Sequence, residues 1–288
     1  MFNIVKEQQQ YQTYILTDEQ AQSQIEVVPE RGGIITRWRI SDRDILYLDA
    51  ARFADPTMSI RGGIPILFPI CGNLPDNLYN YGDRQYQLKQ HGFARDLPWQ
   101  VSETEIGNCA SITLTLNSNE STLAVYPFEF QLVFTYQLQG NSLKILQSYT
   151  NKSSETMPFS AGFHPYFVTQ DKSQLDFTIP SSQYFDHISR DTYSYTSFDF
   201  DKEEIDVAFT SLSKHSTSFR DRATQRQISI LYSDFYSALV FWTIKGKDYV
   251  CLEPWSAPRN ALNTGEKLTH LKPGNTYNAV VEMNCSNF

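Results

Sequence analysis

Apolar and polar residues alternate along much of the chain, whereas the period of an amphipathic helix is scarce. The alternation is clear over residues 112–116 and over residues 130–138, where large apolar side chains occupy every second position. A strand with one buried and one solvated face has this pattern. Gly140-Asn141 follows as a tight-turn pair, and residues 143–145 resume the apolar pattern. This segment therefore predicts a β-hairpin.

The same reasoning predicts strands elsewhere in the chain. Trp38 and Ile40 alternate with arginines, and a last strand is expected over residues 277–283. Residues 238–242 and 249–253 predict a second hairpin across the sequence Lys-Gly-Lys.

One long polar stretch interrupts this pattern. Residues 171–217 are rich in Ser and Asp, and they predict long loops. We see neither a repeat nor a linker, so residues 1–288 are expected to form one domain. The fold class predicted is all-β, a large antiparallel sandwich with few short helices.

Composition narrows the function classes. The chain has 19 Phe, 17 Tyr and 4 Trp, which suits an enclosed β protein and also a sugar-binding cleft, where flat rings contact pyranose faces. The formal charge is −8 with no Lys/Arg stripe, which disfavours nucleic-acid binding. No run is long and apolar enough for a transmembrane helix.

Cysteine spacing and the N-terminus indicate the compartment. The four cysteines are scattered without a C-x-x-C pair, which favours reduced thiols over disulfides or a zinc site. The first ten residues lack the apolar core of a signal peptide. We therefore expect a cytoplasmic protein.

A carboxylate stands out in the segment Tyr249-Val250-Cys251-Leu252-Glu253-Pro254-Trp255. Four apolar or weakly polar residues lead into Glu253, and Trp255 follows closely. A carboxylate in such surroundings is poorly solvated, and it is available for proton transfer or for holding a polar ligand. A salt-bridged Glu at a strand end is the structural alternative.

Two of the five histidines occupy unusual settings. His164 lies in Gly-Phe-His-Pro-Tyr-Phe, an apolar run that predicts burial, and buried histidines are more often structural than catalytic. His91 precedes Gly92, which lets the backbone turn or approach a ligand, and Arg95 offers a fixed fork of donors for oxygens such as those of phosphate. A turn-capping histidine and an ordinary surface arginine are the structural alternatives.

The third unusual stretch begins Arg61-Gly62-Gly63-Ile64-Pro65. Its glycines and prolines predict an irregular, rigid backbone, and it lacks the spacing of a nucleotide-binding loop. Arg61 either points into a cleft or belongs to a rigid connection between strands.

Taken together, these four segments resemble the aldose 1-epimerase (galactose mutarotase-like) superfamily, in particular its bacterial branch and the hexose-6-phosphate mutarotases. The motifs occur in the family's order and span nearly the whole chain. The resemblance implies a large antiparallel β-supersandwich and an isomerase that interconverts the anomers of a hexose or hexose 6-phosphate. It implies no cofactor or metal.

The resemblance also assigns roles to residues. It implies that His164 is the general acid, Glu253 the general base and His91 a sugar-binding histidine. It further implies that Asp206, in the shorter match Glu-Ile-Asp, holds sugar hydroxyls. Arg61 and Arg95 are similar to a pair that holds a 6-phosphate, and Trp255 is expected to wall the site.

Two positions depart from the family pattern. Many members carry an arginine after Phe-Pro-x-x-Gly, whereas this chain has Gly72-Asn73, so that a cation near the sugar is missing from this motif. Many members also have Thr or Ser after the catalytic histidine, where this chain has Pro165. The first departure bears on substrate choice.

Three other function classes remain open at this stage. A non-catalytic carbohydrate-binding protein would keep the aromatic cleft without needing both His164 and Glu253. A cupin-like metal enzyme would use His91, His164 and Glu253 as ligands, although the H-x-H motif of cupins is absent. A glycosidase would pair Glu253 with Asp206 and leave His164 without a role.

Overall fold

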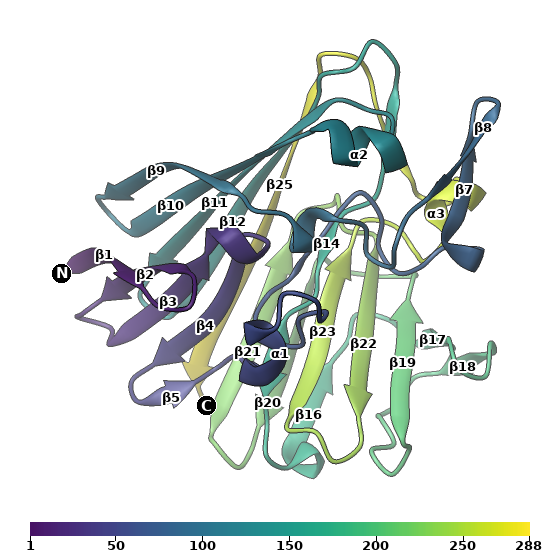
Figure 1. Cartoon of the computed structure of the whole chain (residues 1–288). Helices are drawn as coiled ribbons and strands as arrows, with labels where there is room; N and C mark the ends of the chain where they lie inside the picture. The colour runs from purple at the N-terminus through teal and green to yellow at the C-terminus, as the bar shows by residue number, and fades with distance from the viewer.

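Antiparallel β-sheets make up most of the computed structural model, which describes residues 1–288. Two large sheets pack face to face, and a smaller N-terminal sheet lies beside them (Figure 1). The only α-helices are three short ones, α1 (Ala50–Ala54), α2 (Glu120–Val125) and α3 (Ala261–Thr264). The all-β prediction is therefore confirmed.

The first large sheet contains both chain segments with the clearest alternation. Its strand order is β16-β20-β21-β25-β12-β11-β10-β9. The predicted hairpin is β11 and β12, paired from Phe130 opposite Asn151 to Gln139 opposite Ser142. The strands span β9 (Gln100–Ile106), β10 (Ala110–Asn117), β11 (Phe130–Gln139), β12 (Ser142–Asn151), β16 (Leu175–Thr178), β20 (Ser216–Asp221), β21 (Arg226–Tyr232) and β25 (Thr276–Asn287).

The second large sheet contains the predicted hairpin near Glu253. Its order is β18-β17-β19-β22-β23-β14-β6, with β15 also paired to β23. The strands span β6 (Ile66–Leu67), β14 (Gly162–Phe163), β15 (Tyr166–Val168), β17 (Gln183–Asp186), β18 (Thr192–Ser194), β19 (Glu204–Phe209), β22 (Ala238–Ile244) and β23 (Tyr249–Trp255).

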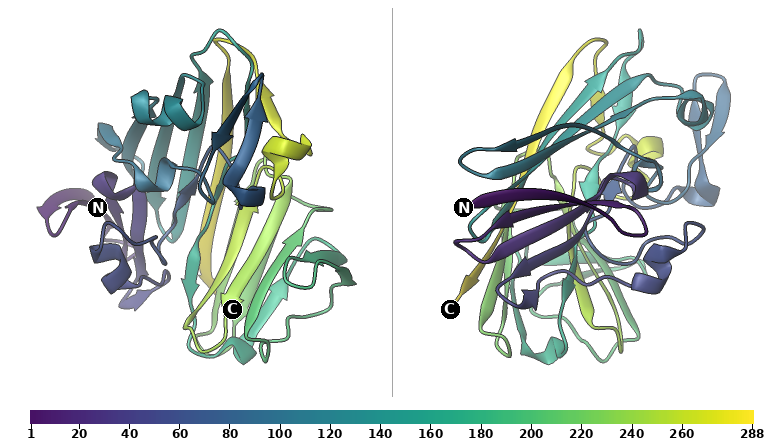
Figure 2. Two further views of the ribbon diagram at one scale, coloured as in Figure 1. Left: turned by 45° about the vertical axis from the view of Figure 1, so that its right-hand side comes forward. Right: turned by 60° about the vertical axis from the view of Figure 1, so that its left-hand side comes forward.

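Smaller units complete the fold. The N-terminal sheet contacts β9, β10 and β11, as two further views show (Figure 2). Its strands are β1 (Phe2–Gln8), β2 (Gln12–Asp18), β3 (Ser23–Val28), β4 (Ile34–Ile40) and β5 (Arg43–Asp44), and the two-stranded units are β7 (Leu78–Tyr81) with β8 (Arg84–Gln87), and β13 (Met157–Phe159) with β24 (Thr269–Leu271).

The core lies between the two large sheets. Fifty-five buried residues form one cluster, and rings from opposite sheets meet in it, as Phe134 meets Phe163 at 6.0 Å between centroids. On β22 and β23 the core residues alternate with residues on the other face. Leu252 belongs to this cluster, and its neighbour Glu253 does not. The period-two pattern therefore separates core from site on these strands.

The loop prediction for residues 171–217 is wrong in part. Four complete strands, β16 to β19, fall in this stretch. Aromatic residues scattered among the Ser and Asp residues explain the difference, because Phe177 and Phe198 pack on Phe241 at 5.2 and 3.7 Å between centroids. The strands β16, β17 and β18 have only three or four residues each, so they lack the long alternation that reveals a strand in sequence. No helix of the protein has the length and hydrophobicity needed to cross a membrane.

Candidate active site

A cavity of about 320 Å³ opens on the outer face of the second large sheet, away from the core. It gathers side chains from six parts of the sequence, and polar and charged residues dominate its lining. All seven residues singled out from the sequence border it. The lining consists of Arg52, Ser59, Ile60, Arg61, Gln90, His91, Arg95, His164, Tyr166, Glu204, Asp206, Val240, Trp242, Glu253, Trp255 and Arg259.

Three neighbouring strands form the floor of this cavity. Asp206 on β19 lies opposite Trp242 on β22, and Val240 on β22 lies opposite Glu253 on β23. Residues directly opposite in an antiparallel pair point to the same face. Strand register therefore places Asp206, Trp242 and Glu253 on one surface, although 47 residues separate the two acids along the sequence.

The imidazole of His164 meets the carboxylate of Glu253 at the cavity. Nε2 of His164 lies 3.3 Å from Oε1 of Glu253, and the two residues are only 8% and 1% exposed. The other oxygen, Oε2, accepts a hydrogen bond of 3.1 Å from the indole N–H of Trp255. Tyr166 stacks on the imidazole, with centroids 4.7 Å apart and planes 11° apart. These contacts fix both groups in orientation.

Burial favours the neutral forms of this pair. It raises the pKa of Glu253 well above its ordinary value, and the nearby Asp206 raises it further. It also lowers the pKa of His164 to about 3, with the positive charge of Arg95 acting in the same direction. The acid and base roles implied by the resemblance call for an ionised Glu253 beside a protonated His164. In the free protein the structure instead favours one proton on the carboxyl group.

His91 has a defined tautomer. Its Nδ1 accepts a hydrogen bond of 3.0 Å from the backbone N–H of Gly72, and burial keeps its pKa well below 6.5. A neutral imidazole that accepts at Nδ1 carries its proton on Nε2. The ring lies 5.6 Å from those of both His164 and Trp255, measured between centroids. His91 is therefore a donor beside the proton-transfer pair.

Three arginines border the cavity without a carboxylate partner. Arg61 lies over the ring of Trp242 at 5.8 Å from its centroid. Arg95 donates one hydrogen bond to the backbone of Gln90, and its buried Nε has no partner in the protein. Arg52 bonds the carbonyl oxygen of Ser59 through Nε, and none of the three forms an ion pair.

Asp206 and Arg259 form a pair at the cavity. Nη2 of Arg259 lies 3.0 and 3.3 Å from the two carboxylate oxygens, and Nη1 donates to Oδ1 of Asn73 at 2.9 Å. The motif has no cation at residue 73, but the guanidinium group of Arg259 lies beside Asn73 in the folded protein. It comes from a residue 186 positions further along the chain.

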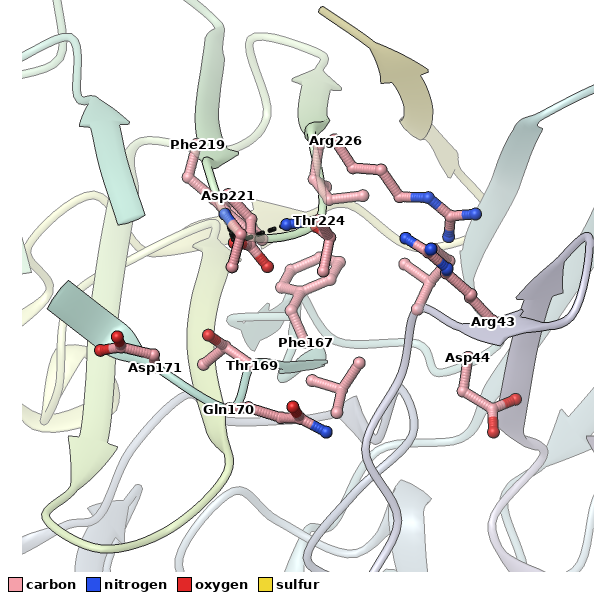
Figure 3. Close-up of a pocket in the computed structure, with 14 residues that line it drawn as sticks. Arg43, Asp44, Phe167, Thr169, Gln170, Asp171, Phe219, Asp221, Thr224 and Arg226 are labelled. Carbon is pink, nitrogen blue, oxygen red and sulfur yellow. Dashed lines mark hydrogen bonds between the residues drawn. The ribbon is translucent and has the colours of Figure 1, made fainter. Parts of the chain in front are cut away.

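A larger cavity of about 580 Å³ lies elsewhere and contains none of the predicted residues. Figure 3 shows Arg43 and Arg226 at one end of it and Asp171 at the other. Its lining includes no histidine, glutamate, cysteine or lysine, and its buried aromatic members Phe167 and Phe219 also belong to the core cluster. The smaller cavity, which is lined by histidines and Glu253, is therefore the better candidate for proton-transfer chemistry.

The side chains do not assemble into the metal site considered from sequence. One group of three potential ligands lies within 4.8 Å, and it consists of His164, Cys251 and Glu253. His91 is outside this group, and its Nδ1 is occupied by the N–H of Gly72. Burial also keeps the Cys251 thiol protonated by raising its pKa, which disfavours the thiolate form that binds metals.

Comparison with known proteins defines the class. The family model for aldose 1-epimerase matches residues 13–284, and the chain belongs to this family. It is therefore an isomerase of the aldose 1-epimerase type, and its antiparallel sandwich is the galactose mutarotase-like fold.

Several individual proteins are similar to this chain in sequence or in fold. The chain is 45% identical to the Slr1438 protein of Synechocystis sp. PCC 6803, with full coverage of both chains and a TM-score of 0.96. A galactose mutarotase-like protein of Clostridium acetobutylicum is 20% identical, with 100% and 99% coverage and a TM-score of 0.85. A plant relative from Cenchrus ciliaris, provisionally named glucose-6-phosphate 1-epimerase, is 30% identical over 50% of this chain and 44% of its own length.

The sequence did not identify every member of the cavity. Arg52, Trp242 and Arg259 lie outside the four motifs, and only the tertiary structure brings them to the site. Arg259 follows Trp255 by four residues, so proximity to the fourth motif was an available signal. His187, which also lies outside the four motifs, is half-buried, and burial lowers its pKa to about 4.

Proposed function

We propose that this protein interconverts the α and β anomers of a hexose 6-phosphate, with Glu253 as general base and His164 as general acid. The observation that carries the proposal is a single cavity that holds both a buried imidazole–carboxyl contact and three arginines without carboxylate partners. The first feature suits reversible proton transfer, and the second suits a phosphate.

Ring opening requires two proton movements. The carboxylate of Glu253 takes the proton from the C1 hydroxyl while the imidazolium of His164 gives a proton to the ring oxygen. The bond between C1 and that oxygen breaks as the C1 aldehyde forms. Rotation about C1–C2 and closure on the other face return both protons, so that no group is consumed.

Glu253 and His164 together carry one proton both before and after ring opening, and only its position differs. A neutral imidazole with a protonated Glu253 is the state that follows ring opening, and burial favours it in the free protein. Opening a closed sugar needs the proton on His164 instead. The 3.3 Å contact between Nε2 and Oε1 allows that shift within the pair.

A bound phosphate favours this shift. The positive charges of Arg95 and Arg61 both oppose protonation of His164. A phosphate held by these arginines would offset their charge, and the imidazolium form would become easier to reach. This electrostatic argument favours a phosphorylated substrate over a free hexose. The name carried by the Cenchrus ciliaris relative agrees with it.

Anomer exchange measured by NMR on glucose, galactose and glucose 6-phosphate tests the proposal. We expect exchange of glucose 6-phosphate well above the rate in buffer alone. Arg95→Ala should lower kcat/KM on that substrate by roughly ten- to 150-fold, since a hydrogen bond to a charged group contributes about 1.5 to 3 kcal/mol. On free glucose the same variant should lose nothing and can gain activity, because the charge of Arg95 opposes protonation of His164.

Arg43→Ala serves as the matched control, because Arg43 borders only the other cavity. Equal losses on glucose and glucose 6-phosphate would remove the phosphate assignment. Binding of sugars without any exchange would instead support a non-catalytic carbohydrate-binding protein. A glycosidase is less well supported, because Arg259 already engages both oxygens of Asp206.

A further inference from the structure

Arg259 enters the cavity from a segment that none of the sequence motifs covers. It lies between the end of β23 at Trp255 and the start of α3 at Ala261. Its side chain is 25% exposed and borders the same cavity as His164 and Glu253. Its position immediately after the strand that carries Glu253 makes it a candidate for a role in substrate placement.

Two partners hold the guanidinium group in a fixed plane. Nη2 donates to both oxygens of Asp206, and Nη1 donates to the side-chain oxygen of Asn73. The guanidinium group has five N–H donors, so these contacts leave the second N–H of Nη1 free, and Nε is buried without a hydrogen-bond partner in the protein. Because part of the side chain is exposed at the cavity, a ligand oxygen can accept from the free N–H of Nη1 in a charge-assisted hydrogen bond.

The backbone at Gly72 makes room for this arrangement. Gly72 has a φ of +73°, and a Cβ added there would lie 2.7 Å from Cγ and 3.2 Å from Nε of Arg259. The N–H of the same residue donates to Nδ1 of His91. Gly72 therefore leaves room for the aliphatic part of the Arg259 side chain, and its N–H fixes the tautomer of His91.

The position of Arg259 compensates for the family arginine that is replaced by Asn73 in this chain. An arginine at residue 73 would put a guanidinium near Asp206 from one loop, and this chain supplies that group from another loop. Asn73 is then an acceptor that orients the cation. The cavity therefore keeps its positive charge, but the arginine side chain that carries it comes from a different loop.

We propose that Arg259, oriented by Asn73 and Asp206, positions a ring hydroxyl of the sugar by donating to it. This inference rests on the proposed function. The proton-transfer pair takes C1 and the ring oxygen, and the free arginines take the 6-phosphate. The hydroxyls on C2, C3 and C4 remain for His91, Arg259 and Asp206, of which the first two donate and the third accepts.

Substrates that lack one hydroxyl test this assignment. Glucose 6-phosphate and its 2-deoxy, 3-deoxy and 4-deoxy analogues are compared on the parent protein and on Arg259→Lys and Arg259→Met. The lysine keeps a positive charge beside Asp206 and removes the fixed fork of guanidinium donors, and it guards against a folding defect of the methionine variant. Arg43→Met is the control.

We expect both variants to lose roughly ten- to 150-fold in kcat/KM on glucose 6-phosphate, mainly through KM. On one deoxy analogue the loss should shrink to about twofold, because the contacted hydroxyl is already absent. A purely structural role would give the same loss on all four substrates, and that result would overturn the inference.

Affinities measured by calorimetry on the same four compounds separate this inference from the proposed function. A parent protein that binds glucose 6-phosphate without exchanging its anomers refutes the catalytic proposal alone. The deoxy series then still decides the role of Arg259 from affinities. A parent that binds none of the four compounds refutes both proposals.

Discussion

Replacing Glu253 with Gln removes the group proposed as base and changes almost nothing else. The amide has the shape of the carboxyl group, and its oxygen can still accept the 3.1 Å hydrogen bond from Trp255. Because Glu253 is 1% exposed and burial opposes its charge, the neutral amide imposes no new desolvation cost. We therefore expect a stability at pH 7 equal to or above that of the parent protein.

The expected loss of activity is much larger. A positioned proton-transfer group contributes on the order of 10² to 10⁴ in rate, which corresponds to about 3 to 5 kcal/mol of transition-state stabilisation. An amide cannot take the C1 proton at neutral pH, so the loss should appear in kcat. NMR exchange measured on glucose 6-phosphate, with the buffer-catalysed rate subtracted, gives this number.

Thermal unfolding distinguishes loss of chemistry from loss of structure. Glu253→Ala is the contrasting variant, since it leaves the buried N–H of Trp255 without its acceptor and opens a space beside His164. We expect it to be destabilised by about 2 to 4 kcal/mol. A folded Glu253→Gln protein that exchanges anomers within threefold of the parent rate would refute the assigned base.

Further expectations concern pH and the backbone. Because the pair works with one shared proton, kcat/KM on glucose 6-phosphate should fall on the alkaline side as Glu253 loses its proton, and a profile without any alkaline fall before the protein unfolds would contradict the mechanism. The pKa of His164, lowered to about 3, means that its neutral form stabilises the fold above pH 6.5 and that this stability is lost as pH falls toward 3. His164→Asn should therefore weaken the decline of the unfolding free energy between pH 6.5 and pH 3. Urea unfolding measured across this pH range checks it, and the same decline as in the parent protein would contradict the expectation. Gly92→Ala should cost at least about 2 kcal/mol, since a Cβ would lie 2.2 Å from the carbonyl oxygen of Phe68 and φ is +70°. Gly82→Ala, also at positive φ but with nothing within 4 Å, should cost about 1 kcal/mol, and equal losses in chemical denaturation would show that the close approach at Gly92 is unimportant.

The alternation of apolar residues by itself determined the main strands. Residues 130–138 and 143–145 alternate because one face of β11 and β12 is buried, and that requirement is local to each strand. The strands β16, β17 and β18 escaped detection because they have three or four residues each, too few for a clear alternation. The burial of β16 depends on the contact of Phe177 with Phe241, which lies elsewhere in the sequence.

The residues of the candidate site were also visible in sequence, but their arrangement was not. Each motif marked a residue type in unusual surroundings, and the resemblance joined His164 to Glu253. Only strand register brought Asp206 onto the same face as Glu253, and only loop packing brought Arg259 to Asn73. The protonation of the pair likewise follows from burial, which is a property of the packed structure and of no single segment.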